Sequence, residues 1–376
     1  MLDFYWMLVF GFTLTGLCNG LLAIPVFRRG KWYFYPFLGA VTGFAAAKYF
    51  VWYASAYSSY GDTAHWAAYA ATGFMVAHVI IFVPLILLAL LSCLQKIRKP
   101  VRLLGTVILP LALCIGIYGS VDGEKNEITE YHDVYAENLP DGFDGFKLAQ
   151  ITDPHIGPYY RNTDLAEDLD RAKAAGAEVI MLTGDLIDDI RVMPETAEIL
   201  TTRSKLFPYG IIYVRGNHEL YRNPSYIEKE LEQTTVHVLN NSHMTITRGK
   251  DLLFVAGADY PGLQREGREG REERMKALTE EAFRNIPETA ACIFLAHHSD
   301  AIDGGFRHHA FLTLTGHTHG LQTGIFGKPF ITPFKYTRGM YSNGKDSGYV
   351  SRGNGGWFPF RFGCPRELTV FTLHKK

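Results

Sequence analysis

Cysteine is scarce in this sequence, and the chain carries almost no net charge. The five cysteines lie far apart, at Cys18, Cys93, Cys114, Cys292 and Cys364. Such scattered positions do not make a disulfide framework, so we expect none. The formal net charge at pH 7 is −1, which offers no basic surface of the kind that binds nucleic acid. We therefore expect no nucleic-acid partner.

The first 120 residues contain few charged side chains and four long apolar stretches. Each stretch approaches or exceeds the roughly 20 residues that a helix needs to cross a bilayer. The stretches are residues 4–27, 33–57, 66–94 and 103–119. Tryptophan and tyrosine gather near their ends, as at membrane interfaces. The sequence therefore predicts an integral, multi-pass membrane protein, with an all-α bundle of four transmembrane helices over residues 1–120 and a second domain over residues 121–376.

The first stretch lacks the basic start of a secretory signal peptide and carries Asp3 instead. Three further spans follow it, so we interpret it as a retained helix. Lys48 and His78 are ionisable residues inside the predicted helices, and such residues indicate a functional site by default. Lys48 is a candidate contact for a lipid phosphate, although snorkelling also brings such a charge to the interface.

Lysine and arginine are absent from the second predicted loop, residues 55–65, and this absence sets the predicted orientation. Among the loops, the first and third carry all the lysine and arginine residues, which are Arg28, Arg29, Lys31, Lys96, Arg98, Lys99 and Arg102. The positive-inside rule places these two loops in the cytoplasm. Both ends of the helical domain, and the domain that follows it, are then predicted on the extracytoplasmic side of the membrane.

Five short polar blocks follow apolar runs in the second domain. The runs predict buried strands over residues 147–152, 179–183, 211–215, 291–296 and 311–315. Amphipathic patterns between them predict helices over residues 163–175, 194–205 and 223–233, and a charged stretch over 264–285 predicts a loop that runs into a helix. Parallel strands bring their carboxyl ends to one crevice, so we expect all five blocks to converge on one edge of the sheet.

The residue types in these blocks indicate a hydrolytic site with two metal ions. The blocks contain Asp153, His155, Asp185, Asp188, Asn217, His218, Glu219, His297, His298, His317 and His319. Where two ligands stand at i and i+2, alternation along an extended backbone sends both to one side. Imidazole and carboxylate ligands suit Zn, Mn or Fe. A carboxylate such as Asp185 can bridge two ions, and His218 is placed to act as an acid.

At these residues the chain resembles the calcineurin-like metallophosphoesterases, over about residues 125–376. The resemblance implies a four-layer α/β/β/α sandwich. It also implies that one metal is held by Asp153, His155, Asp185 and His319, and a second by Asp185, Asn217, His297 and His317. By the same resemblance, His218 is the general acid on the leaving group.

The tail, residues 349–368, resembles the membrane- or envelope-associated phosphodiesterase branch of this family. The resemblance rests on Gly353, Gly355, Arg361, Pro365 and Glu367. The chain departs from the family at two places. Leu321 stands where a second glycine is common, and His298-Ser299 stands where Asn-Pro is common. Two histidines therefore compete for one ligand position, and we prefer His297 because it lies two residues after Leu295.

Further residues are expected to support the ligands or to touch the substrate. The supporting or substrate-binding candidates are Asp188, Glu219, His298 and Arg361. The candidate lipid contacts are Lys48, Tyr159, Tyr160, Arg161 and Trp357, which mix aromatic rings with cations. His308 and His309 have no motif around them, and we expect both at the surface.

These patterns predict a membrane-anchored phosphoesterase with two divalent transition-metal ions. The expected target is a phosphodiester or pyrophosphate bond of an amphiphilic, lipid-linked substrate, with membrane lipids as further partners. One alternative is a phosphoesterase that acts on soluble nucleotides or phosphomonoesters. Another is a membrane sensor whose metal domain only binds. The chain retains Asp185, Asn217 and His218 together, which favours an enzyme.

Overall fold

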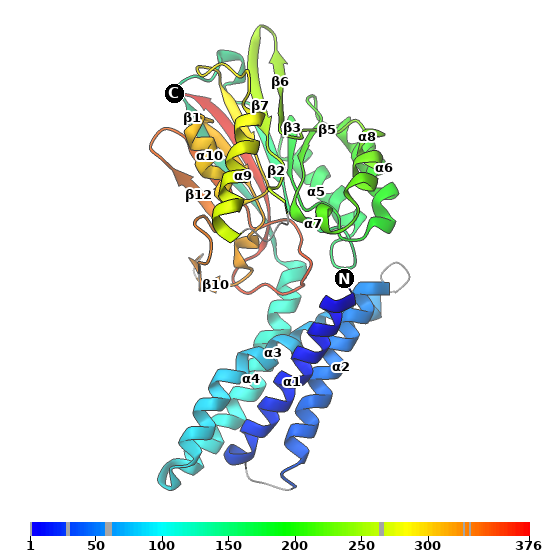
Figure 1. Cartoon of the computed structure of the whole chain (residues 1–376), viewed down its shortest axis with the longest axis vertical. Helices are drawn as coiled ribbons and strands as arrows, with labels where there is room; N and C mark the ends of the chain where they lie inside the picture. Colours follow the sequence, from blue (N-terminus) through cyan, green and yellow to red (C-terminus); the bar gives the residue numbers. More distant parts are fainter. Residues whose placement is uncertain (1, 28–30, 57–61, 263–266, 326–327, 331) are drawn as a thin grey trace. The chain divides into compact units, whose positions relative to one another are not determined.

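The computed structural model describes residues 2–376 except 28–30, 57–61, 263–266, 326–327 and 331 (Figure 1). The chain divides into two compact units. The helical unit contains Met1–Lys125 and Phe358–Phe362. The sheet unit contains Asn126–Trp357 and Gly363–Lys376. A short segment near the C-terminus therefore belongs with helices that lie more than two hundred residues before it in the sequence.

All four predicted spans form helices, labelled in Figure 1. They are α1 (Leu2–Phe27), α2 (Phe34–Ala56), α3 (Asp62–Ser92) and α4 (Arg98–Lys125). In the described part of the chain, three ranges are long and apolar enough to cross a membrane: Phe4–Phe27, Thr63–Ser92 and Gln95–Gly123. α2 is not among these three, because Lys48 and several tyrosines lower its mean hydropathy. That α2 crosses the membrane stays a prediction.

Glycine allows the helices of this unit to approach closely in pairs. A Cβ added to Gly16 of α1 would collide with the backbone of Gly39 in α2. A Cβ added to Gly116 of α4 would likewise collide with the backbone of Gly73 in α3. Small residues bring helix backbones together where no hydrophobic effect drives their association, as in a membrane.

His78 takes part in a polar contact that joins three helices. The side-chain amide of Asn19 donates to the carbonyl oxygen of His78 at 2.8 Å, and Thr42 Oγ1 lies 3.1 Å from His78 Nε2. Asn19 and His78 are buried. A buried polar group needs such partners, so packing explains His78 without a further role.

The segment Phe358–Phe362 packs among these helices. The ring of Phe358 lies 5.5 Å from that of Phe50, and the Arg361 N–H donates to the carbonyl oxygen of Gly119 at 2.8 Å. A Cβ on Gly119 would collide with the ring of Phe360, so this glycine leaves the space that the ring fills. Arg361 is 2% exposed. No local pattern in the sequence indicates this packing.

The sheet unit contains two mixed six-stranded sheets. The first has the order β1 (Glu127–Ala136), β14 (Arg366–Lys375), β2 (Lys147–Ile151), β3 (Val179–Thr183), β4 (Ile211–Val214) and β5 (His237–Val238). The last strand, β14, lies between the first two, parallel to β1 and antiparallel to β2. β2, β3, β4 and β5 are parallel to one another.

The second sheet has parallel strands in its middle and antiparallel strands at both edges. Its order is β12 (Gly339–Ser342), β13 (Ser347–Val350), β9 (Leu312–Thr315), β8 (Cys292–Leu295), β7 (Asp251–Gly257) and β6 (Ser242–Arg248). A separate short hairpin joins β10 (Gly324–Ile325) to β11 (Lys328–Pro329).

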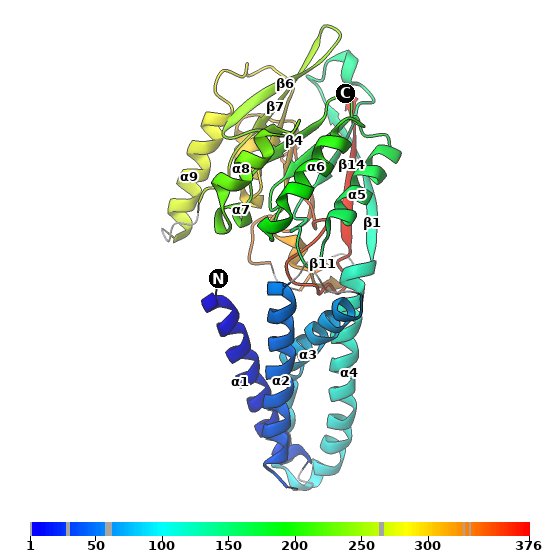
Figure 2. The same cartoon turned by 90° about the vertical axis from the view of Figure 1, so that its right-hand side faces the viewer.

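The two sheets share one buried apolar core, to which Met181 and Val214 of the first sheet and Ile293 and Leu314 of the second contribute. α5 (Asn162–Ala174) contacts β14, and α6 (Met193–Ser204) packs against α5 and α8 (Pro224–Glu232), as Figure 2 shows. α9 (Gly267–Ala282) and α10 (Ile302–Arg307) contact the second sheet. The predicted four-layer sandwich is confirmed.

The prediction that all five blocks lie at the edge of one sheet is wrong. Three blocks follow β2, β3 and β4 of the first sheet, and two follow β8 and β9 of the second. The sequence contains apolar runs of similar character in both sheets, so the runs alone do not divide the strands between them. The site lies where strand ends of both sheets meet.

Candidate metal centre

Three groups of side chains in the described residues are arranged so that each could hold a metal ion. The groups are Asp153, His155 and His319; His155, Asp185 and His218; and Asp185, His297 and His317. Within each group the candidate ligand atoms lie within 4.8 Å of one another. Asp185 and His155 each belong to two groups, so the groups form one continuous centre.

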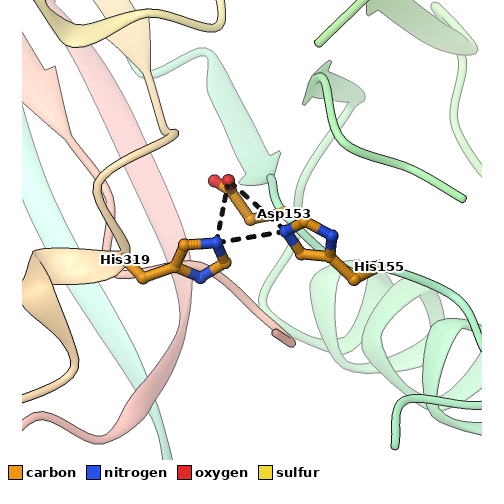
Figure 3. Close-up of side chains that lie close together, drawn as sticks. All are labelled: Asp153, His155 and His319. Atoms are coloured by element: carbon orange, nitrogen blue, oxygen red, sulfur yellow. Dashed lines mark hydrogen bonds and ion pairs between the residues drawn. The ribbon is translucent and has the colours of Figure 1, made fainter. Parts of the chain in front are cut away.

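The first group joins the end of β2 to the end of β9 (Figure 3). Nε2 of His155 lies 3.1 Å from Nε2 of His319. Oδ1 of Asp153 lies 3.4 Å from Nε2 of His319 and 4.0 Å from Nε2 of His155. All three side chains are buried, so these atoms face one another with little water around them.

A second group surrounds Asp185, which follows β3. Nδ1 of His297 donates to the carbonyl oxygen of Thr183 at 2.8 Å, so a neutral His297 presents a bare lone pair at Nε2. That atom lies 3.1 Å from Oδ2 of Asp185 and 3.3 Å from Nδ1 of His317. The same carboxylate oxygen lies 3.6 Å from Nε2 of His155. Asp185 therefore stands between the two groups.

These residues fit a pair of transition-metal ions. A neutral His297 and an ionised Asp185 would point two acceptors at each other, and a cation between them removes that repulsion. Asn217 is 6% exposed, and its Oδ1 is a buried acceptor without a hydrogen-bond partner among the described residues. An orphaned amide oxygen beside imidazole and carboxylate ligands suits a metal ligand.

The ligand candidates lie on unusual backbone. Asp153, His155, Asp185, His317 and His319 all have φ between 50° and 72°. We expected ligands at i and i+2 to point to one side because side chains alternate along an extended strand. This explanation is wrong, because β2 ends at residue 151 and these residues adopt left-handed conformations. Such conformations cost roughly 1–3 kcal/mol each and gather at functional sites. The turns, and not the strands, aim the side chains.

His218 contacts the carboxylate of Asp188. Nδ1 of His218 lies 2.5 Å from Oδ1 of Asp188, which also accepts from Nη2 of Arg222 at 3.1 Å. The N–H of His218 donates to Oδ1 of Asp185 at 2.8 Å. Burial disfavours the charged imidazole, but Asp188 and Asp185 outweigh it and raise the pKa of His218 to about 9. A proton on this ring is thus stabilised at neutral pH.

Glu219 is buried and ties two of the blocks together. Its carboxylate accepts from the N–H groups of Leu186 at 2.6 Å and Gly216 at 2.8 Å. Burial and the nearby charge of Asp185 raise its pKa. One side chain therefore fixes the loops after β3 and β4 relative to each other. This fits the supporting role expected of Glu219.

His298 belongs to none of the three groups that the described residues form. Its Nδ1 accepts from the N–H of Asp300 at 3.2 Å. The geometry therefore agrees with the preference for His297 in this pair.

Tyr260 was missed by the sequence interpretation, yet its ring lies 5.6 Å from that of His317 and 5.9 Å from that of His298. It follows β7 directly, the same strand-end position as the five blocks.

The candidate lipid contacts differ in their surroundings. Tyr160 is 1% exposed, and its hydroxyl donates to Oδ2 of Asp168 at 2.6 Å. The predicted lipid contact of Tyr160 is therefore wrong, because the ring is part of the core of the sheet unit. Tyr159 is buried as well, whereas Trp357 is 39% exposed. The backbone N–H of Arg161 donates to Asp164 at the start of α5.

Two predicted contacts, Lys48 and Arg361, belong to the helical unit. Nζ of Lys48 lies 5.3 Å from the ring centroid of Trp6, a cation–π arrangement. His308 stacks on Phe283, with ring centroids 4.5 Å apart, while the side chain of His309 is 69% exposed. The expectation of a surface position therefore holds for His309, and His308 lies against the core behind the second sheet.

Comparisons with known proteins agree with this site. The family model described as calcineurin-like phosphoesterase matches residues 146–321, which include all five blocks. An uncharacterized metallophosphoesterase of Bacillus subtilis, YkuE, is 32% identical over 263 residues, 66% of this chain and 85% of that protein. A transmembrane protein with metallophosphoesterase domain from Danio rerio is 25% identical over 69% of this chain, which spans 60% of that relative's length.

Among solved structures, a dimetal phosphatase from Danio rerio matches 56% of this chain and 88% of its own, with 12% identity and a TM-score of 0.34. The family of this chain is assigned from two findings. They are the extent of the Bacillus match and the position of the family model over the five blocks. The chain belongs to the calcineurin-like phosphoesterase family, with N-terminal helices of which three have the length and composition of membrane spans.

Proposed function

We propose that this chain is a membrane-anchored hydrolase of phosphodiester or pyrophosphate bonds that works with two divalent transition-metal ions. The position of Asp185 is the observation that carries the proposal. Its Oδ2 lies 3.1 Å from Nε2 of His297 and 3.6 Å from Nε2 of His155. A carboxylate between two nitrogen-rich groups is suited to bridge two ions.

In this assignment the ligands divide between the two ions around the shared Asp185. Asp153, His155, Asp185 and His319 would hold one ion, and Asp185, Asn217, His297 and His317 would hold the other. Such a pair would supply activation of water at neutral pH and neutralisation of the negative charge of a phosphoryl group. The protein supplies the fixed positions, through the left-handed turns at five of the seven ligands.

His218 donates a proton to the leaving oxygen in this mechanism. Its Nδ1 is engaged by Asp188, so the proton on Nε2 is the one available for transfer. The two carboxylates beside the ring keep it protonated near neutral pH. Arg222, which also donates to Asp188, helps to fix that carboxylate and through it the direction of the imidazole.

We further propose that the substrate is lipid-linked and that the sheet unit lies on the extracytoplasmic side. A single span would suffice to tether a soluble hydrolase, whereas the described residues contain three candidate spans and a fourth apolar helix. The basic residues of the first and third loops support the orientation. Of these, five lie in the described structure, namely Lys31, Lys96, Arg98, Lys99 and Arg102, whereas Arg28 and Arg29 fall outside it.

Two other functions predict different behaviour. A hydrolase of soluble nucleotides or phosphomonoesters would turn over a water-soluble headgroup as fast as its lipid-linked form. A metal-binding sensor would bind ions without hydrolysis, and it would have no use for a proton donor held as His218 is held by Asp188. This pairing favours an enzyme.

The test uses full-length protein in detergent. Elemental analysis should find about two transition-metal ions per chain, and bis(p-nitrophenyl) phosphate should be hydrolysed faster than p-nitrophenyl phosphate. A chelator should abolish both activities. Protein without bound metal, whose hydrolysis is insensitive to chelators, would overturn the proposal.

A further inference from the structure

His298 is a buried imidazole whose tautomer the backbone sets. The N–H of Asp300 donates to its Nδ1 at 3.2 Å. A ring nitrogen that accepts a hydrogen bond carries no proton, so the single proton of this neutral ring lies on Nε2. His297, next to it in sequence, has the opposite arrangement, because its Nδ1 donates to Thr183. With both rings neutral, as metal binding requires of His297, the two adjacent histidines present a lone pair and an N–H donor, respectively.

The Nε2–H of His298 has no acceptor in the described structure. This atom is buried and without a hydrogen-bond partner, and the residue as a whole is 2% exposed. Native proteins leave few buried donors unpaired, and each exception calls for an explanation. No carboxylate, imidazole or thiol completes a metal group with His298 among the described residues. The donor therefore lacks both an acceptor and a metal role.

Aromatic rings around His298 place it beside the metal centre. Its ring centroid lies 4.7 Å from that of His317, 5.9 Å from Tyr260 and 6.2 Å from Phe334. Tyr260 and Phe334 are half-buried, so part of this aromatic surround reaches solvent. A phenol is protonated at neutral pH, so Tyr260 can serve as a second donor.

Arg271 on α9 adds positive charge at the same place. α9 contacts the turn Ser299–Ala301, which directly follows His298. Among the described residues, Nε of Arg271 is a buried donor without a hydrogen-bond partner. Three donor groups gather here beside a site for a phosphate ester.

We propose that His298, Tyr260 and Arg271 form an anion subsite that binds a second negatively charged group of the substrate. The proposal rests on the proposed function and specifies its substrate class: a phosphate ester whose retained arm carries a further phosphate or phosphonate. His218 follows a strand of the first sheet, whereas His298 follows a strand of the second. The leaving group faces His218, and the arm that stays on phosphorus faces the subsite.

A buried donor gains more from a charged acceptor than from water. Hydrogen bonds to charged groups contribute about 1.5–3 kcal/mol, and each 1.4 kcal/mol is a tenfold change in affinity. The His298 N–H, which has no acceptor otherwise, should alone be worth about tenfold or more in the binding of the second anion.

The test compares two esters that release the same leaving group. One is p-nitrophenyl ethyl phosphate, and the other is p-nitrophenyl 2-phosphonoethyl phosphate, which carries an additional anion on the retained arm. The full-length wild-type protein should have a KM about tenfold lower for the phosphono ester. Values of kcat for the two esters should be similar, because the subsite does not touch the leaving oxygen.

Variants at His298 separate donor loss from loss of the side chain. His298→Asn keeps an amide near Nδ1 but removes the donor at Nε2, and it should abolish the preference for the phosphono ester. His298→Gln places an amide N–H near the position of the histidine Nε2, and it should restore much of the preference for the phosphono ester. His309→Asn, at an exposed histidine of the same unit, is the matched control and should keep the wild-type preference.

Arg271→Gln should weaken the preference for the phosphono ester. Every variant should retain about two metal ions per chain and the wild-type unfolding temperature. Loss of metal from His298→Asn would make His298 a ligand and overturn the subsite. An unchanged KM ratio in both His298 variants would also overturn it.

Failure of the subsite and failure of the proposed function give different results. Wild-type protein that hydrolyses neither ester and binds no metal would overturn the proposed function itself. Normal hydrolysis of the ethyl ester, with no preference for the phosphono ester in any variant, would overturn only the subsite.

Discussion

The imidazole of His218 lies against the carboxylate of Asp188, with Nδ1 2.5 Å from Oδ1. Its other ring nitrogen, Nε2, lies 4.0 Å from Oδ2 of Asp185. One carboxylate therefore orients the ring, while the opposite edge faces the metal centre. His218 also belongs to one of the three candidate ligand groups, so the metal content of a His218 variant distinguishes a proton donor from a metal ligand.

Replacement of His218 should impair catalysis without loss of metal. His218→Asn removes the proton donor, and the rate should fall by roughly 10²–10⁴-fold, the usual scale for a general acid. Esters with an alkoxide leaving group should lose more than p-nitrophenyl esters, which need little protonation. Elemental analysis of the variant should match the wild type, and a variant that lost metal would contradict the assigned role.

Replacement of Asp185 should affect both ions together. Asp185→Asn keeps the size of the side chain but weakens a ligand shared by two groups, so bound metal should fall from about two ions to fewer than one. Asp170→Asn is the control, because Asp170 is exposed on α5 and pairs with Arg203. Loss of one ion with full retention of the other would exclude a bridging role.

Asp168 should make the stability of the sheet unit depend on pH. Burial, followed by the charge of Glu127, raises its pKa to about 7, against about 3.9 in an unfolded chain. Between these two pH values, the folded state therefore binds one proton more than the unfolded chain. The stabilisation is therefore complete below about pH 4 and is lost as pH rises through about 7.

Unfolding temperatures of the full-length protein in detergent, measured from pH 4 to 8, test this dependence. Asp168→Asn should flatten the decline over that interval, because the amide does not titrate. Asp170→Asn, on the same helix and 52% exposed in its side chain, should leave the decline unchanged. Identical pH profiles for wild type and Asp168→Asn would refute the prediction.

Sidedness can be measured with reporters. A reporter that is active only outside the cytoplasm should be active when fused after Lys376 and silent when fused at Lys96. This outcome follows from the basic residues of the first and third loops. The reverse pattern would place the metal centre in the cytoplasm.

A lipid-linked substrate should depend on the helical unit. Full-length protein in lipid discs should turn over a long-chain phosphodiester lipid faster than its water-soluble headgroup analogue. The preference should disappear in a truncated protein that begins at Asn126 and carries a Gly-Ser linker in place of residues 358–362. Equal preference in both proteins would leave the helices as an anchor alone.

Much of the sheet unit could be predicted because its strands are short, buried and bounded by glycine. The run before Gly184 illustrates this, since β3 covers the predicted residues 179–183 without deviation. The ligand candidates could be found because histidine and aspartate gather directly after such runs. Parallel strands make that position a crevice whichever sheet they join.

Other features could not be predicted because they depend on contacts between distant residues. Tyr160 has the sequence context of an interfacial aromatic, yet its hydrogen bond to Asp168 on α5 holds it in the core. Phe358 and Phe360 have the sequence context of loop aromatics, and only the small Gly119 leaves room for one of them. The left-handed turn at His155 has no glycine that would indicate it.

The place of β14 between β1 and β2 has a consequence for synthesis on the ribosome. β2 leaves the ribosome with its neighbouring position in the sheet still vacant, because residues 366–375 are made more than two hundred residues later. At 5–20 residues per second, this interval lasts roughly 10–40 s. Throughout it, two strand edges are open to mispairing with other chains. The nascent protein should therefore depend on a chaperone or on the membrane insertion machinery until the last strand is inserted.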